Sequence, residues 1–193
     1  MNCSQLIDKV SKCVICEPDL PLGARPVIQA NPNARILIAG QAPGLKVHQS
    51  GVPFNDASGV RLRQWLGIDE NEFYNPNNIA ILPMGFCYPG KGKSGDLPPR
   101  KECAPTWRDP LLKSLPNIEL TIILGKYAQA YHLPQTKKQT LTELVKSWRE
   151  FWPSHLVLPH PSPRNNIWLK KNPWFEEDIL PCVKNSVATI LKK

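Results

Sequence analysis

Two segments of the sequence gather residue types that can bind and cleave a small ligand. The first reads Gly40-Gln-Ala-Pro-Gly44 and continues to Gly51-Val-Pro-Phe54-Asn-Asp56. Glycines that follow a strand let the backbone approach a ligand closely, and their N–H groups can bind an anion or a carbonyl. An ordinary turn between a strand and a helix would use the same glycines. The segment is not a phosphate-binding P-loop, because no Gly-Lys-Ser/Thr follows at the required spacing.

The second segment reads His160-Pro-Ser-Pro-Arg-Asn165 and follows a short apolar run. Its two prolines stiffen the chain and fix the side chains between them. A histidine held in this way can donate a hydrogen bond to a developing anion. Ser162, Arg164 and Asn165 can bind phosphates. The segment therefore combines a candidate catalytic group with candidate nucleic-acid contacts.

An apolar and basic stretch, Trp168-Leu169-Lys170-Lys171, comes next in the chain. Apolar bulk beside two lysines suits a wedge that enters a base stack between phosphate contacts. The same stretch would equally suit the start of an amphipathic helix.

The chain as a whole is basic, with a formal net charge of +8 over 193 residues. A basic surface suits a polyanionic partner, nucleic acid first and an acidic membrane second. No run of 18 apolar residues occurs, so we expect no membrane span. The polar first 18 residues lack the apolar core of an export signal, which favours a cytoplasmic protein with reduced cysteines.

Four of the six cysteines have the order and spacing of a metal site. They are Cys13, Cys16, Cys87 and Cys103. A Cys-x-x-Cys pair and two further thiolates can hold zinc or an iron–sulfur cluster. Four buried thiols without a metal are the alternative, because free cysteine is among the most buried residue types. The other two, Cys3 and Cys182, lie outside the pattern and are expected to be unliganded.

Apolar runs alternate with helical patterns, which predicts an α/β fold with a short parallel sheet. The expected strands are 35–40, 79–82, 120–125 and 156–158, and the expected helices are 5–11, 59–66, 103–115, 127–132, 140–151 and 173–191. Residues 40–56 are too rich in Gly and Pro for a regular element, and residues 85–99 are expected to form a long loop. No repeat or linker divides the chain, so residues 1–193 form one expected domain with a loop-rich N-terminal segment, 1–33.

Together, these motifs resemble the uracil-DNA glycosylase superfamily. The first segment is similar to the Gly-Glu-Ala-Pro-Gly…Gly-x-Pro-Phe segment of the iron–sulfur (family 4) uracil-DNA glycosylases, and the four cysteines resemble the cluster ligands of that family. The segment from His160 to Asn165 is more similar to the His-Pro-Ser-Pro-Arg-Asn loop of the single-strand-selective monofunctional uracil glycosylases. The resemblance covers Cys13 to Trp174.

The resemblance implies a three-layer α/β/α sandwich around a parallel four-stranded sheet. It implies a monofunctional DNA glycosylase of base excision repair, which flips out uracil or another deaminated base and hydrolyses the N-glycosidic bond to leave an abasic site. It further implies a [4Fe–4S] cluster on the four cysteines and DNA with a damaged base as the partner. Nothing in the sequence requires more than a monomer.

The resemblance also implies roles for individual residues. The base-binding set is Gly40, Gln41, Ala42, Pro43, Gly44 and Phe54, with Phe54 stacked on the flipped base. His160 would stabilise the negative charge on the leaving base. The DNA-binding set is Ser162, Arg164, Asn165, Trp168, Leu169, Lys170 and Lys171, and Trp168 or Leu169 would fill the gap that the base leaves.

Several positions depart from the pattern of the superfamily. Gln41 replaces a Glu of family 4, Ala42 replaces a water-positioning Asp, Val47 and His48 replace an acidic pair, and Pro83 replaces a base-reading Asn. The water-positioning role is therefore assigned to Asp56 or His48. Asp56 could instead cap a helix N-terminus.

Two other functions remain open at this point. A module of the same fold could bind damaged or single-stranded DNA without cutting it, or could trap the abasic product covalently through His160. A hydrolase of free nucleosides or nucleotides is the third option. The basic Lys91-Gly-Lys93 and Lys170-Lys171 disfavour it, because phosphate contacts dominate the binding of nucleic-acid polymers.

Overall fold

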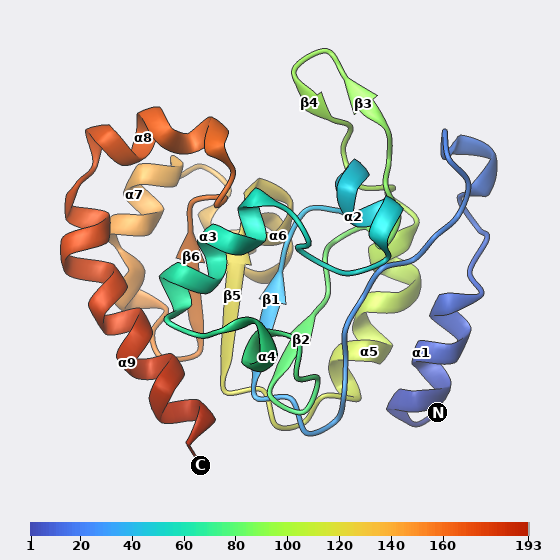
Figure 1. Ribbon diagram of the computed structural model, residues 1–193, viewed down its shortest axis with the longest axis horizontal. Coiled ribbons are helices and arrows are strands. Elements are labelled where there is room, and N and C mark those ends of the chain that lie inside the picture. Colours follow the sequence, from blue (N-terminus) through green and yellow to red (C-terminus); the bar gives the residue numbers. More distant parts are fainter. Residues whose placement is uncertain (193) are drawn as a thin grey trace.

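The computed structural model describes residues 1–192, which are built around one parallel sheet (Figure 1). Its strands are β1 (Ile36–Ala39), β2 (Ile79–Ile81), β5 (Leu120–Leu124) and β6 (His155–Leu158). They lie in the order β2-β1-β5-β6, and each neighbouring pair is parallel. Almost every strand residue is buried, because both faces of the sheet are covered, and this explains the continuous apolar runs in the sequence.

Nine α-helices are described among residues 1–192. They are α1 (Cys3–Ser11), α2 (Leu45–Ser50), α3 (Ala57–Leu66), α4 (Glu70–Phe73), α5 (Asp109–Lys113), α6 (Lys126–His132), α7 (Leu141–Lys146), α8 (Asn166–Lys171) and α9 (Leu180–Leu191). Short 3-10 turns lie at Glu17–Asp19, Pro134–Thr136, Trp148–Glu150 and Pro163–Asn165, and π-helical turns at Ala104–Arg108 and Phe175–Ile179 lead into α5 and α9.

Alternate residues of β1 pack into different helical layers. Leu37 lies in an apolar cluster with Leu6 of α1 and Leu111 of α5. Ile38 lies in a larger cluster with Leu62 of α3, and α9 packs beside α3 in the same layer. The structure therefore confirms the predicted α/β/α sandwich with a four-stranded parallel sheet.

All four strands point the same way, so the loops that follow them meet at one edge of the sheet. Gly40 follows β1, and the segment beginning at His160 follows β6, although 120 residues separate them in the chain. Hydrogen bonds from Met84 N to the Gly40 carbonyl (2.9 Å) and from Gly85 N to the Gln41 carbonyl (3.0 Å) join the loops after β1 and β2. Ligands of open α/β sheets bind at this edge.

Two segments predicted to be irregular contain regular structure. Helix α2 lies inside residues 40–56, because Gly44 begins it in an extended conformation and Gly51 ends it with a φ of 72°. Residues 85–99 contain a hairpin of β3 (Lys91–Gly92) and β4 (Gly95–Asp96), which projects from the top of the molecule in Figure 1. Both predictions of an irregular chain were wrong, because glycine also marks helix ends and tight hairpins.

The predicted helices are present with shifted ends; α4 was not predicted, and α8 corresponds to the helical alternative for the stretch from Trp168 to Lys171. The helix expected over 59–66 is α3, which Gly67 terminates with a φ of 69°. The stretch 140–151 divides into α7 and a 3-10 turn, and 173–191 begins as a π-helical turn before α9. None of the helices described in residues 1–192 is long and apolar enough to cross a bilayer.

Candidate active site

An open cavity of about 470 Å³ lies at the carboxyl edge of the sheet. Its volume falls in the range of sites that take a small organic ligand. Eleven of the residues predicted from the two motifs line it: Gly40, Gln41, Ala42, Pro43, Gly44, Phe54, Asp56, His160, Ser162, Arg164 and Asn165. The fold thus brings the two motifs, distant in sequence, to a single cavity.

Five other predicted residues do not line this cavity. They are His48, Trp168, Leu169, Lys170 and Lys171. His48 is buried against Tyr88, with 6.0 Å between the ring centroids, and its Nδ1 has no hydrogen-bond partner among the described residues. Of the two residues predicted to position water, the structure therefore places Asp56, and not His48, at this cavity.

The side chain of Trp168 belongs to the wall of the core. Its Nε1 donates to Oγ1 of Thr142 at 2.9 Å, and its ring packs against Trp174 and Phe175. The exposed apolar side chain of α8 is Ile167, which is 69% exposed. A wedge formed by Trp168 would have to leave these contacts, whereas Ile167 is already free.

Phe54 is held in an unusual backbone conformation beside the first motif. Its φ is +55°, which is uncommon for any residue other than glycine and often marks a functional position. A methyl group added to Gly59 would lie 1.8 Å from the Phe54 carbonyl oxygen, so only glycine fits there. The Phe54 ring meets Phe73 edge-on and lies 3.7 Å from a methyl group built on Gly40, and both Phe54 and Gly40 line the cavity.

His160 is positioned as a neutral hydrogen-bond donor. The backbone N–H of Ser162 donates to His160 Nδ1 at 3.3 Å, so the ring proton of the neutral form resides on Nε2. Burial lowers the pKa of His160 below its ordinary value; Arg164 acts in the same direction, while Asp56 and Asp96 oppose it. Asn165 Nδ2 donates to the His160 carbonyl at 2.7 Å and closes the loop. The side chain is therefore neutral at pH 7 and can donate from Nε2.

Asp56 has a structural role in addition to its place in the cavity. Its Oδ1 accepts the backbone N–H of Gly59 at 2.9 Å, and Asp56 is the N-cap of α3. The helix also contributes Arg61, whose Nη1 donates to the carbonyl of Ser162 at 3.2 Å. The capping alternative for Asp56 is thus present in the structure.

The hairpin β3–β4 brings residues to the cavity that sequence reasoning missed: Ser94, Gly95 and Asp96. Arg164 Nη1 donates to the Ser94 carbonyl at 3.2 Å. Gly95 has a φ of +142°, and a methyl group on it would lie 2.3 Å from that same guanidinium nitrogen. No local sequence signal identifies these residues, because their place depends on a contact across 70 positions of the chain.

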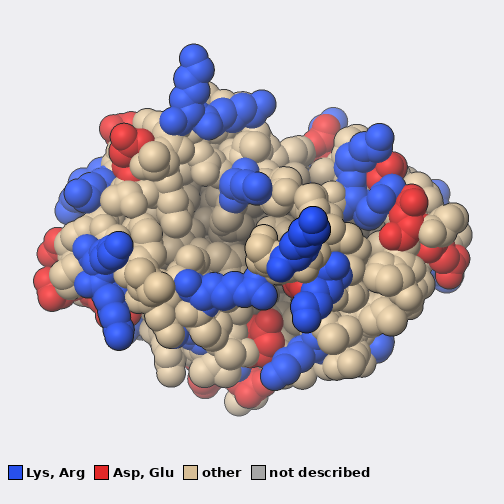
Figure 2. All heavy atoms as spheres, turned by 90° about the horizontal axis from the view of Figure 1, so that it is seen from above, with Lys and Arg blue, Asp and Glu red and all other residues tan. Residues whose placement is uncertain are grey.

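The face that carries the cavity is basic. Figure 2 looks onto it and shows a hollow with Lys and Arg side chains on several sides. Exposed lysines stand on three elements around it: Lys46 on α2, Lys91 and Lys93 on the hairpin, and Lys170 and Lys171 on α8. Such a distribution favours the approach of a polyanion.

The four cysteines of the predicted metal site line one small cavity of about 20 Å³. Cys13 Sγ accepts the indole N–H of Trp107, and Cys103 Sγ accepts the backbone N–H of Phe86, both at 3.3 Å. Burial raises the pKa of Cys87 to about 11 and that of Cys103 to about 12. In the described part of the chain no three His, Cys, Asp or Glu side chains are arranged to hold a metal ion. The donor set fits a cluster, but the thiols would have to converge to bind it.

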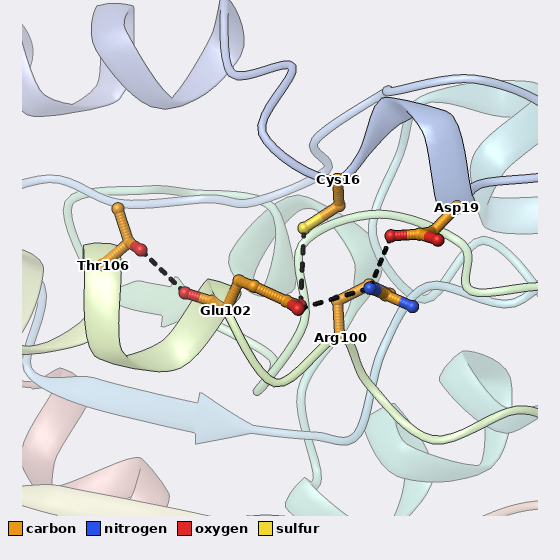
Figure 3. A network of polar contacts seen from close by, with 5 residues as sticks. All are labelled: Cys16, Asp19, Arg100, Glu102 and Thr106. Carbon is orange, nitrogen blue, oxygen red and sulfur yellow. Dashed lines mark hydrogen bonds and ion pairs between the residues drawn. The ribbon is translucent and has the colours of Figure 1, made fainter.

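A network of charged side chains borders the cysteine cavity (Figure 3). Arg100 forms ion pairs with Asp19 at 2.6 Å and with Glu102 at 3.3 Å, and Glu102 also accepts a weak hydrogen bond from the Cys16 thiol at 3.9 Å. Thr106 Oγ1 donates to the Glu102 carbonyl at 2.7 Å. The network joins the N-terminal segment to the chain before α5.

A comparison with known families agrees with this arrangement. The model of the Uracil DNA glycosylase superfamily matches residues 27–184. The matched span contains both motif loops, the hairpin, Cys87 and Cys103, and it begins after Cys13 and Cys16. Members of this superfamily are glycosylases that act on DNA. With the sheet, the cavity and the match in agreement, the chain belongs to the uracil DNA glycosylase superfamily.

Proposed function

We propose that this protein is a monofunctional DNA glycosylase that flips out uracil or another deaminated base and hydrolyses its N-glycosidic bond. The observation that carries the proposal is the single cavity in which the Phe54 ring, the backbone of residues 40–44 and His160 meet. A base must leave the duplex to reach such a cavity, because its glycosidic carbon is inaccessible inside the stack.

In this proposal Phe54 stacks on the flipped base and the backbone from Gly40 to Gly44 contacts its edge. When the bond between C1′ and the base nitrogen breaks, the base departs with the bonding electrons. His160 Nε2–H donates to the negative charge that develops on the base. A neutral donor aimed at developing charge inside a cavity can supply a large part of the catalysis. The lowered pKa of His160 keeps the ring neutral.

The DNA backbone would be held at the rim of the cavity. Ser162, Arg164 and Asn165 lie there, and the exposed lysines on the hairpin and α8 flank them. The exposed Ile167 is better placed than Trp168 to fill the gap in the stack. No lysine lines the cavity among residues 1–192, which supports hydrolysis without a Schiff-base step.

The four cysteines are proposed to hold a [4Fe–4S] cluster, with zinc as the alternative. Support comes from four thiols around one cavity and from the N–H groups already directed at two of the sulfurs. The cluster would connect the N-terminal segment to the loop after β2 and to the chain before α5, and it takes no part in the hydrolysis.

The test is base release from oligonucleotides that carry uracil, hypoxanthine or xanthine, single- and double-stranded, read by alkaline strand cleavage. His160→Ala should lower the release by about 100-fold or more, because it removes a donor to the leaving base. His155→Ala is the matched control, since His155 begins β6 at the opposite edge of the sheet. Equal release by wild type and His160→Ala would contradict the assigned role.

A second candidate is a module that binds damaged DNA without cutting it, or that traps the abasic product covalently through His160. Ala42 offers no carboxylate in the first motif, and Asp56 is engaged as a helix cap, which favours this reading. Salt-sensitive binding without base release would support the binding module. A denaturant-resistant protein–DNA adduct that His160→Ala abolishes would support trapping.

A further inference from the structure

Hydrolysis needs a group that orients the water and accepts its proton, and a carboxylate is well suited to both tasks. Among the residues of the cavity that the structure describes, two are carboxylates: Asp56 and Asp96. The two carboxylates differ in the hydrogen bonds that their side chains already form.

The Asp56 side chain is committed to the backbone of its own helix. Oδ1 accepts the Gly59 N–H at 2.9 Å and caps α3. The Asp96 side chain has no hydrogen bond or ion pair with any residue in the part of the chain described. It is exposed at the cavity, so its oxygens are free to bind water or substrate.

Asp96 is nevertheless held firmly, because both motif loops bind the backbone on either side of it. Arg164 donates to the carbonyl of Ser94 at 3.2 Å, and Gln41 Nε2 donates to the carbonyl of Leu97 at 3.1 Å. The hairpin adds a bond from Leu97 N to the Gly90 carbonyl at 2.8 Å. Hydrogen bonds from both motif loops therefore fix the backbone on either side of Asp96.

The carboxylate points toward the backbone that is proposed to contact the base. A methyl group built on Gly44 would lie 3.5 Å from Asp96 Oδ2. Asp96 also acts on His160 across the cavity, since its charge raises the pKa of that histidine against the effect of burial. The two side chains thus share one cavity without a direct hydrogen bond.

We propose that Asp96 is the carboxylate that orients the attacking water in this cavity and accepts its proton. The inference rests on the proposed glycosylase function and deepens it. The bond from C1′ to the base nitrogen breaks, and the base leaves as an anion beside His160. The carboxylate faces the positive charge that forms on the sugar. Water then adds to C1′ and gives a proton to Asp96. That proton passes from Asp96 through solvent to the departed base. The products are therefore the neutral base and the abasic site.

The experiment compares Asp96→Asn with wild type on the oligonucleotide whose base the wild type releases. We expect single-turnover release to fall about 10²- to 10⁴-fold, the usual contribution of a general base. Binding to DNA with a tetrahydrofuran abasic analogue should not weaken, because the change is nearly isosteric and removes a negative charge that would repel phosphate. Asp69→Asn, an N-cap outside the cavity, carries the same change of charge and should release the base at the wild-type rate.

Two further variants keep the proposal falsifiable. Asp96→Ala should regain part of its release when formate is added, because formate can occupy the vacated space as a carboxylate. Asp56→Asn retains the cap, since Asn and Asp are comparable N-caps, and should lose less than Asp96→Asn. Full activity of Asp96→Asn, or a loss confined to Asp56→Asn, would overturn the inference while the glycosylase stands. Absence of release by the wild type would instead refute the proposed function.

Discussion

Arg108 donates a hydrogen bond from Nη2 to Nε2 of His132 at 2.6 Å, although the arginine is completely buried. Its other terminal nitrogen donates to the carbonyls of Leu82 and Pro83, at 2.7 and 3.0 Å. The guanidinium thereby provides hydrogen-bond donors to the two carbonyls that follow β2, and Pro83 is one of the residues that line the cavity. Arg108 has no ion pair with a carboxylate among residues 1–192, and an unpaired cation is costly to bury. Its hydrogen bonds to the backbone and the Tyr131 ring, 5.0 Å away, offset that cost.

Replacing Arg108 with Met should destabilise the protein by about 2 kcal/mol or more, because two buried carbonyls lose their donor at ~1–3 kcal/mol each. Chemical denaturation would measure the change. Lys113→Met, an exposed cation on the following helix, is the control and should stay within about 0.5 kcal/mol. Similar values for the two variants would show that the bonds of Arg108 contribute little.

The stability of the protein should decline as the pH falls below about 6.5. Burial, followed by Arg108 and His155, lowers the pKa of His132 to about 3, so the native state binds that proton less readily than the unfolded chain. The unfolded state therefore binds more protons between about pH 6.5 and 3, and stability is lost progressively over this window at up to ~1.4 kcal/mol per pH unit. Burial lowers the pKa of His48, His155 and His160 as well, which acts in the same direction.

Denaturation midpoints at pH 7, 6, 5 and 4 would test this dependence. His132→Asn should have a shallower decline than wild type, because it lacks the titrating group. A decline of equal steepness in the variant would assign the acid sensitivity to other groups.

Gln41→Glu should release the hairpin from the first motif. The amide Nε2 donates to the Leu97 carbonyl, whereas a carboxylate has no proton to donate and would repel that oxygen. We expect faster hydrogen exchange over residues 90–97 and base release reduced by about tenfold, as the position of Asp96 loosens. Gln49→Glu, with the same change on an exposed residue of α2, should alter neither. Unchanged exchange in Gln41→Glu would show that the hydrogen bond does not hold the hairpin.

Cys87→Ser should reduce the iron bound by the purified protein to near zero, if four thiolates hold the cluster. Cys182→Ser is the matched control, because Cys182 lies in α9 and does not line the cysteine cavity. Iron, sulfide and zinc would be measured together. Zinc without sulfide would replace the cluster by a zinc site, and full metal content in Cys87→Ser would remove that residue from the ligand set.

Much of the fold was predictable, because each strand is buried on both faces and appears as an apolar run. Ile36–Ala39 and Leu120–Leu124 are examples. Because β1, β5 and β6 are parallel neighbours, the loop after Ala39 and the one at His160 lie at the same edge of the sheet. Most of the residues that line the cavity belong to the two sequence motifs, residues 40–56 and 160–165. Helix α2 was missed because Gly44 and Gly51, which bound it, also fit an irregular segment.

The contribution of the hairpin could not be predicted, since a strand of two residues has no periodicity. The place of Asp96 depends on the reach of Arg164 and Gln41, and only the folded chain shows it. The same holds for Trp168, which the sequence suggested as a wedge for the DNA stack. Its indole N–H donates to Thr142 on another helix, so its side chain packs against the protein core.

The N-terminal segment also runs along the outer side of β2, where Gln29 and Ile81 exchange backbone hydrogen bonds of 3.0 and 2.7 Å. An open strand edge is a template for pairing with another chain, and this segment covers the edge of β2. The cysteine cavity and the Arg100 network hold the same segment in place. Disruption of the cysteine cavity would therefore expose the edge of β2, an apolar strand that can pair with another chain. Its first observable consequence would be self-association of the protein and not a loss of base release.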